Sequence, residues 1–136
     1  MEVAQKMERL RQLRRVVQAA PARQFKMNDI QCGTAMCAAG WAAIDPWFVA
    51  RGLRLIPGDG RHSPARVETE TIRFTFPALA EFFGLDEEDA DTLFAADATR
   101  STGRIPKAEV IANIDRMLKG HSPAEYRAIL LEERNL

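Results

Sequence analysis

The sequence predicts a mostly α-helical protein: a compact bundle of about five or six helices around a buried Ala/Gly-rich helix, with one small β-hairpin. Three patterns support this fold class. The uncharged stretch 34–43 has Ala or Gly at six of its ten positions, its flanking segments repeat apolar residues every three or four positions, and a middle segment alternates with period two. At 136 residues the chain fits a single domain, 1–136, with room for a hydrophobic core.

The first predicted helix runs from about the start of the chain to Ala20, because Pro21 cannot continue it. Its apolar stripe consists of Val3, Met7, Leu10, Leu13 and Val17. A basic face lies mostly off that stripe and comprises Lys6, Arg9, Arg11, Arg14 and Arg15. This face is either a nucleic-acid surface or a solvated helix face, and the second interpretation is favoured because the chain has no net charge.

The stretch 34–43 is predicted to be the central helix, because alanine is the best helix former. Thr34 is expected to cap it through its hydroxyl, and Gly33 lets the backbone turn in. A helix without charge and with small residues all round is a buried one. Cys37 and Trp41 are four residues apart and are therefore expected to share a face. The connector before this helix is expected to fill the core with Phe25, Met27 and Ile30.

Asp45 and Pro46 are expected to stop or restart the central helix, with one further turn over 47–49 that ends at Gly52. Alternating apolar residues predict strands at 53–55 and 72–76, with 67–71 as an extension of the second. Between them, 57–64 is dense in turn-forming residues and predicts a loop. Two strands alone are marginal, so the hairpin is expected to pack against the helices.

Four further helices are predicted in the second half of the chain. Their start and stop signals are Pro77 in a first turn, Gly84 and Gly120 at C-terminal ends, and Asp86 as an N-cap. Their ranges are 77–83, 87–96, 106–118 and a last helix that begins at about 122.

The pattern Cys-Gly-Thr-x-x-Cys-x-Ala-Gly-Trp resembles that of a family of small uncharacterised bacterial and phage proteins. The matching residues here are Cys32, Gly33, Thr34, Cys37, Gly40 and Trp41. A Phe-x-Met at 25–27 and a Gly-Leu-x-x-x-x-Ala-x-x-Leu-Phe segment at 84–94 are similar to that family as well. The resemblance covers about the middle two thirds of the chain and implies a related fold, with these six residues as its structural motif. It implies no activity and no catalytic residue.

Two cysteines and two histidines raise the question of a zinc site. Four residues separate Cys32 from Cys37, at the edge of common zinc spacing, and His62 and His121 are isolated in predicted loops. Both cysteines are therefore expected to be reduced, metal-free packing residues in the cytoplasm. No phosphate-loop, nucleophile-elbow or zinc-protease motif is present, so no catalytic residue, metal ligand or cofactor is predicted. The sequence contains no run of eighteen apolar residues, so no membrane span is predicted.

The leading functional prediction is a non-enzymatic protein-binding module of phage or mobile-element origin that occupies a host protein or complex. An inhibitor such as an anti-CRISPR protein would be one such role. Loops concentrate binding residues, and Arg and Trp are enriched at interaction hot spots. The partner-binding candidates are Arg61, Arg66, Arg100, Arg104 and Trp47. Two alternatives remain open: a small enzyme or ligand-binding domain with an unrecognised pocket, and a nucleic-acid binder that uses the basic face of the first helix.

Overall fold

The computed structural model describes residues 1–25, 37–59, 65–94 and 107–121, and within these ranges it is mostly helical with a small two-stranded antiparallel sheet. The elements are α1 (Val3–Ala19), a 3₁₀ turn (Ala22–Gln24), α2 (Ala38–Ile44), α3 (Pro46–Val49), β1 (Arg54–Ile56), β2 (Arg66–Glu68), α4 (Thr75–Phe83), α5 (Glu87–Phe94) and α6 (Lys107–Leu118). The predicted fold class is confirmed. The predicted last helix, beginning at about 122, lies outside the described residues, as do Met27 and Ile30 of the connector.

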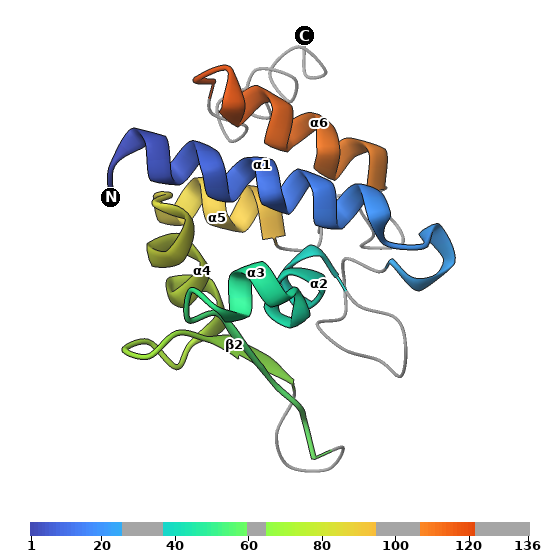
Figure 1. The fold of residues 1–136 in the computed structure, drawn as a ribbon, viewed down its shortest axis with the longest axis vertical. Helices are drawn as coiled ribbons and strands as arrows, with labels where there is room; N and C mark the ends of the chain where they lie inside the picture. Colours follow the sequence, from blue (N-terminus) through green and yellow to red (C-terminus); the bar gives the residue numbers. More distant parts are fainter. Residues whose placement is uncertain (26–36, 60–64, 95–106, 122–136) are drawn as a thin grey trace, which may run out of the picture.

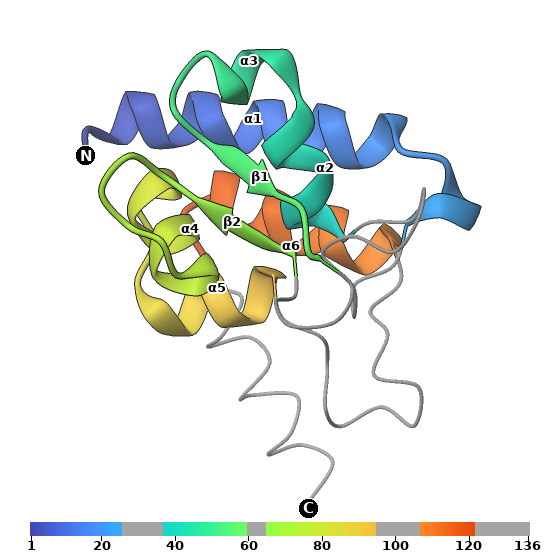
Figure 2. The ribbon, with the colours of Figure 1, turned by 90° about the horizontal axis from the view of Figure 1, so that it is seen from below.

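The long helix α1 runs across the molecule, with α6 packed along one side of it and α2 and α4 against another (Figure 1). The two strands lie side by side, with α2 and α3 on one side and α4 and α5 on the other (Figure 2). The hairpin therefore packs against α2 and α4, as expected for a sheet too small to be stable alone.

An ion pair and hydrogen bonds from charged side chains connect α1 to α6. The Arg14 guanidinium donates to both carboxylate oxygens of Asp115, at 2.7 and 3.4 Å, and this hydrogen bond together with the Asp115 charge raises the pKa of Arg14. The Lys107 ammonium donates to the carbonyls of Gln18 and Ala20 at 2.6 and 2.7 Å. It thereby satisfies carbonyls at the C-terminal end of α1, where a positive charge is favourable.

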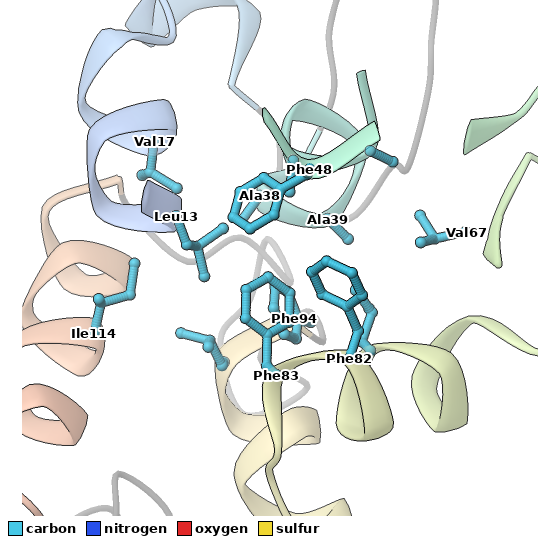
Figure 3. Packing of buried hydrophobic residues seen from close by; sticks show 14 of the residues in the cluster. Leu13, Val17, Ala38, Ala39, Phe48, Val67, Phe82, Phe83, Phe94 and Ile114 are labelled. Carbon is cyan, nitrogen blue, oxygen red and sulfur yellow. The ribbon is translucent and has the colours of Figure 1, made fainter. Parts of the chain in front are cut away.

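The core joins α2 to an aromatic cluster. Figure 3 shows Ala38, Ala39 and Phe48 facing Phe82, Phe83 and Phe94, with side chains of α1 and α6 at one side. The buried members of α2 are Ala38, Ala39, Gly40, Ala42 and Ala43. A buried helix of small residues is thus present as predicted, because small side chains let neighbouring elements approach it closely.

The predicted start of this helix is wrong. Cys37 is the N-cap residue, and its backbone is extended, with ψ at 177°. The first helical hydrogen bond runs from the amide of Trp41 to the carbonyl of Cys37 at 3.0 Å. An extended residue cannot continue a helical turn, so α2 cannot begin at Thr34, which itself lies outside the described residues. Cys37 precedes the helical residues of α2, so the helical spacing that predicted one shared face with Trp41 does not apply to this pair.

The apolar stripe of α1 is confirmed over its central turns, where Leu10, Leu13 and Val17 are fully buried. The outermost member, Val3, is 70 % exposed, so its assignment to the stripe is wrong.

The predicted helix signals act where the sequence places them. The carboxylate of Asp45 accepts from the amide of Phe48 at 3.3 Å, so Asp45 ends α2 and caps α3. The carboxylate of Asp86 accepts from the amide of Asp89 at 2.8 Å at the start of α5. Gly84 follows α4 with φ at 66°, a left-handed conformation that favours glycine.

The second strand is not where the alternation predicts it. β2 pairs with β1 in the antiparallel register Arg54↔Glu68, Leu55↔Val67 and Ile56↔Arg66, so the strand predicted at 72–76 is wrong. The amide of Ile72 donates to the Thr69 hydroxyl at 3.1 Å, and this bond closes a turn. Next, the Thr75 hydroxyl accepts from the amide of Val67 at 3.1 Å, which ties the start of α4 to β2. Residues 75 and 76 are consequently part of α4 and not of a strand.

Candidate protein-interaction surface

Trp47 of α3 lies at the surface beneath Arg51, which belongs to the turn after that helix. The guanidinium carbon of Arg51 is 3.4 Å from the centroid of the Trp47 ring, and the same side chain donates to the Trp47 carbonyl at 2.9 Å. Trp47 also packs edge-on against Phe48, with ring centroids 5.2 Å apart. The two contacts hold the indole half-buried and stack a planar cation on it, an arrangement that stabilises both groups.

Arg9 of α1 makes a similar contact with α4. One guanidinium nitrogen donates to the Phe82 carbonyl at 2.6 Å, and the guanidinium carbon is 4.0 Å from the Phe82 ring centroid. The Phe82 carbonyl belongs to the last turn of α4, where carbonyls lack helical partners. The Nε atom of Arg9 is buried and has no hydrogen-bond partner among the residues that the structure describes. Arg9 therefore retains unused donor capacity beside an aromatic ring.

The charge of Arg51 acts on Arg9. Burial lowers the pKa of Arg9, and the positive charge of Arg51 lowers it further, while Glu8 acts in the opposite direction. The Glu8 carboxylate is 3.9 Å from Arg51 and 62 % exposed, so it forms a weak ion pair without a hydrogen bond. We call Arg9, Arg51, Trp47 and Glu8 the arginine–tryptophan surface. Its formal charge is positive, since two guanidiniums face one carboxylate.

Of the predicted partner-binding residues, Trp47 lies in this surface, whereas Arg66 binds within the hairpin. The Glu68 carboxylate accepts from Arg54 at 3.2 Å and from Arg66 at 3.4 Å. The Glu68 side chain is only 10 % exposed, so the two arginines compensate a largely buried negative charge. Arg61, Arg100 and Arg104 lie outside the described residues.

The described part of the Cys-Gly-Thr motif supports the core. Cys37 and Gly40 are buried at the start of α2. The indole nitrogen of Trp41 donates to the Gln24 carbonyl at 3.4 Å, which connects α2 to the 3₁₀ turn after α1. Cys32, Gly33 and Thr34 lie outside the described residues.

Contacts within the protein divide the predicted basic face of α1. Arg9 turns toward Phe82, and Arg14 binds Asp115 of α6. Arg15 donates to Gln12 of its own helix at 3.2 Å. Arg11 is exposed on the same helix. A nucleic-acid surface needs a continuous row of accessible cations. Arg9 and Arg14 instead bind groups of α4 and α6, so they do not contribute to such a row.

A second surface feature lies at the start of α4. Phe74, the N-cap residue, is 75 % exposed, and Phe76 is 40 % exposed. Phe76, Pro77, Glu87 and Asp91 line a hollow of about 180 Å³, which we call the aromatic–acidic hollow. Sequence reasoning missed it because the phenylalanines were assigned to a strand. The available signal was Pro77, which marks a first helical turn just after both aromatic residues.

Phe74 is an unfavourable N-cap, because its side chain cannot accept a hydrogen bond from the first-turn amides. We expect Phe74→Ser to raise the free energy of unfolding by about 0.5–1 kcal/mol, measured by urea denaturation. Arg73→Ser, one residue outside the cap and also exposed, is the matched control and should change stability by less than about 0.5 kcal/mol. A loss of stability in Phe74→Ser would show that the exposed ring contributes to folding.

Comparison of the chain with protein-family models, with curated proteins and with solved structures finds no match. Within the described ranges, no group of three or more His, Cys, Asp or Glu residues could hold a metal ion. Among the helices of the same ranges, none is both long and apolar enough to cross a bilayer.

Proposed function

We propose that this protein is a non-enzymatic protein-binding module that engages its partner through the arginine–tryptophan surface. The observation that carries the proposal is the approach of Arg9 and Arg51, each stacked on an aromatic ring and close enough for one charge to lower the pKa of the other. Tryptophan and arginine are the residues most enriched at interaction hot spots. Here the fold brings them together from α1 and from the region of α3.

The chemistry of this surface favours an acidic partner. A carboxylate of the partner would accept hydrogen bonds from Arg51 and offset the repulsion between the two guanidiniums. Trp47 would add a rigid apolar contact that loses little conformational entropy on binding. The proposed partner is a host protein of the cytoplasm. A phage or mobile-element origin belongs to the proposal through the motif at 32–41. Inhibition, as by anti-CRISPR proteins, is one role that such binding would serve, and no motif selects it.

Arg51→Ala is expected to weaken partner binding by about 2 kcal/mol, roughly thirtyfold, because it removes the cation and the cover of Trp47. The tagged protein would be expressed in its host, the partner recovered after cross-linking, and the purified pair measured by calorimetry. Arg11→Ala removes an equal charge from an exposed position of α1 and should bind like the parent. Equal affinities of Arg51→Ala and the parent would contradict the assignment of this surface.

Arg100 and Arg104, which the sequence predicts to lie in a loop, are to be tested in the same assay, since their predicted role is independent of the arginine–tryptophan surface. Each alanine variant is expected to weaken binding by about 1–2 kcal/mol while leaving the melting temperature unchanged. Turnover of a small molecule without any recoverable protein partner would contradict the proposed function as a whole.

A further inference from the structure

The start of α4 differs from the starts of two neighbouring helices. Asp45 caps α3 and Asp86 caps α5, each through a carboxylate that accepts a hydrogen bond from an amide of the first turn. At the same position α4 has Phe74, which makes no cap bond and leaves most of its ring in water. Local stability would favour a polar cap here as well. A residue that breaks a local folding rule and exposes a large apolar side chain points to a role in binding.

The hollow lined by Phe76, two residues after Phe74, collects negative charge. Glu87 and Asp91 are four residues apart on α5, so their carboxylates share one face and repel each other. Among the described residues, neither has an ion-pair partner. Glu81 of α4 accepts from the Thr71 hydroxyl, and Arg73 is the nearest cation to Phe76 along the chain. The hollow is thus lined by the apolar Phe76 and Pro77 together with two carboxylates.

We propose that the aromatic–acidic hollow is a second docking site, and that its occupant is an arginine or lysine side chain from a basic segment of a partner protein. Carboxylates accept charge-assisted hydrogen bonds from such cations, and the faces of Phe76 and Phe74 attract the same groups. The hollow, at about 180 Å³, is smaller than the roughly 300–1,000 Å³ of small-molecule sites and suits one long side chain. Its charge is opposite to that of the arginine–tryptophan surface, so this proposal extends the proposed function to a second kind of contact.

The test uses a displayed library of random dodecapeptides, panned against the full chain. Recovered peptides should be enriched in arginine and lysine, and their binding, measured by fluorescence anisotropy, should weaken in high salt. Glu87→Gln is expected to reduce peptide affinity about fivefold to tenfold. Glu88→Gln is the matched control, since it removes the same charge from the same helix terminus but does not line the hollow, and it should bind like the parent.

Phe74→Ser separates binding from folding, because it removes the exposed ring while supplying a better cap. It should lose peptide affinity without a lower melting temperature, and Arg51→Ala should bind the peptides unchanged. Recovery of no basic peptides, or equal binding by Glu87→Gln and Glu88→Gln, would overturn the proposal. A dimer detected by light scattering that Phe74→Ser dissociates would also overturn it, since the occupant would then be a second copy. None of these results depends on Arg51, so they leave the proposed function to its own test.

Discussion

Replacing Phe48 with alanine is expected to lower the free energy of unfolding by about 3–5 kcal/mol. Phe48 is fully buried, and its ring centroid lies 5.7 and 5.5 Å from those of Phe82 and Phe83. The variant would lose these edge-on contacts and leave a cavity where α3 meets α4. Urea denaturation followed by circular dichroism measures the effect.

Val49→Ala is the matched control, because Val49 follows Phe48 in α3 but is exposed. It should change the free energy of unfolding by less than about 0.5 kcal/mol. Phe48→Ala should also weaken partner binding, since Phe48 supports the Trp47 ring edge-on. If both variants unfold at the parent's urea concentration, the aromatic cluster does not form the core.

Gly40→Leu is expected to cost about 1–3 kcal/mol or more, because Gly40 is buried in α2 where neighbouring elements approach closely. Leucine is the better helix former by up to about 1 kcal/mol, so the steric cost must exceed that gain. The measured loss of stability in Gly40→Leu would therefore report how tightly α2 is packed. Thermal unfolding at matched protein concentration gives the comparison.

Ala108→Leu adds a leucine to an exposed position of α6 and should be nearly neutral. A Gly40→Leu variant that melts like the parent would mean that α2 has free space beside Gly40. The same result would contradict the explanation that small residues in α2 allow neighbouring elements to approach closely.

Zero net charge is an average that conceals how the charges are arranged. Because Lys plus Arg equals Asp plus Glu, composition favours no strongly charged ligand. In the fold, Arg9 and Arg51 gather on one surface, while Glu87 and Asp91 share a hollow elsewhere. Two local surfaces of opposite charge are thus compatible with a neutral chain.

The sequence by itself determined the helix boundaries that local chemistry controls. Asp45 and Asp86 cap helices because a carboxylate can reach an amide three residues later. Gly84 ends α4 because glycine adopts a left-handed backbone at little cost. The apolar stripe of α1 and the burial of α2 follow from spacing and from the absence of charge.

The position of the second strand was decided by tertiary contacts. Alternation at 72–76 is a local pattern, and it cannot anticipate that the Thr75 hydroxyl bonds the amide of Val67. The register between β1 and β2 likewise places Glu68 directly opposite Arg54, and the two side chains form a hydrogen-bonded ion pair across the strands. Alanine content predicted a helix over 34–43, but the extended backbone of Cys37 moves its start to Ala38.

The candidate surface also exists only in the folded chain. Trp47 and Arg51 are four residues apart, a spacing that the sequence displays, and their stacking was open to prediction. Arg9 and Phe82 are 73 residues apart, and no local spacing relates them. They meet because α1 and α4 pack on the same core. In that position, burial and the charge of Arg51 both lower the pKa of Arg9. Residue type indicated which side chains bind well, and packing selected the ones that share a surface.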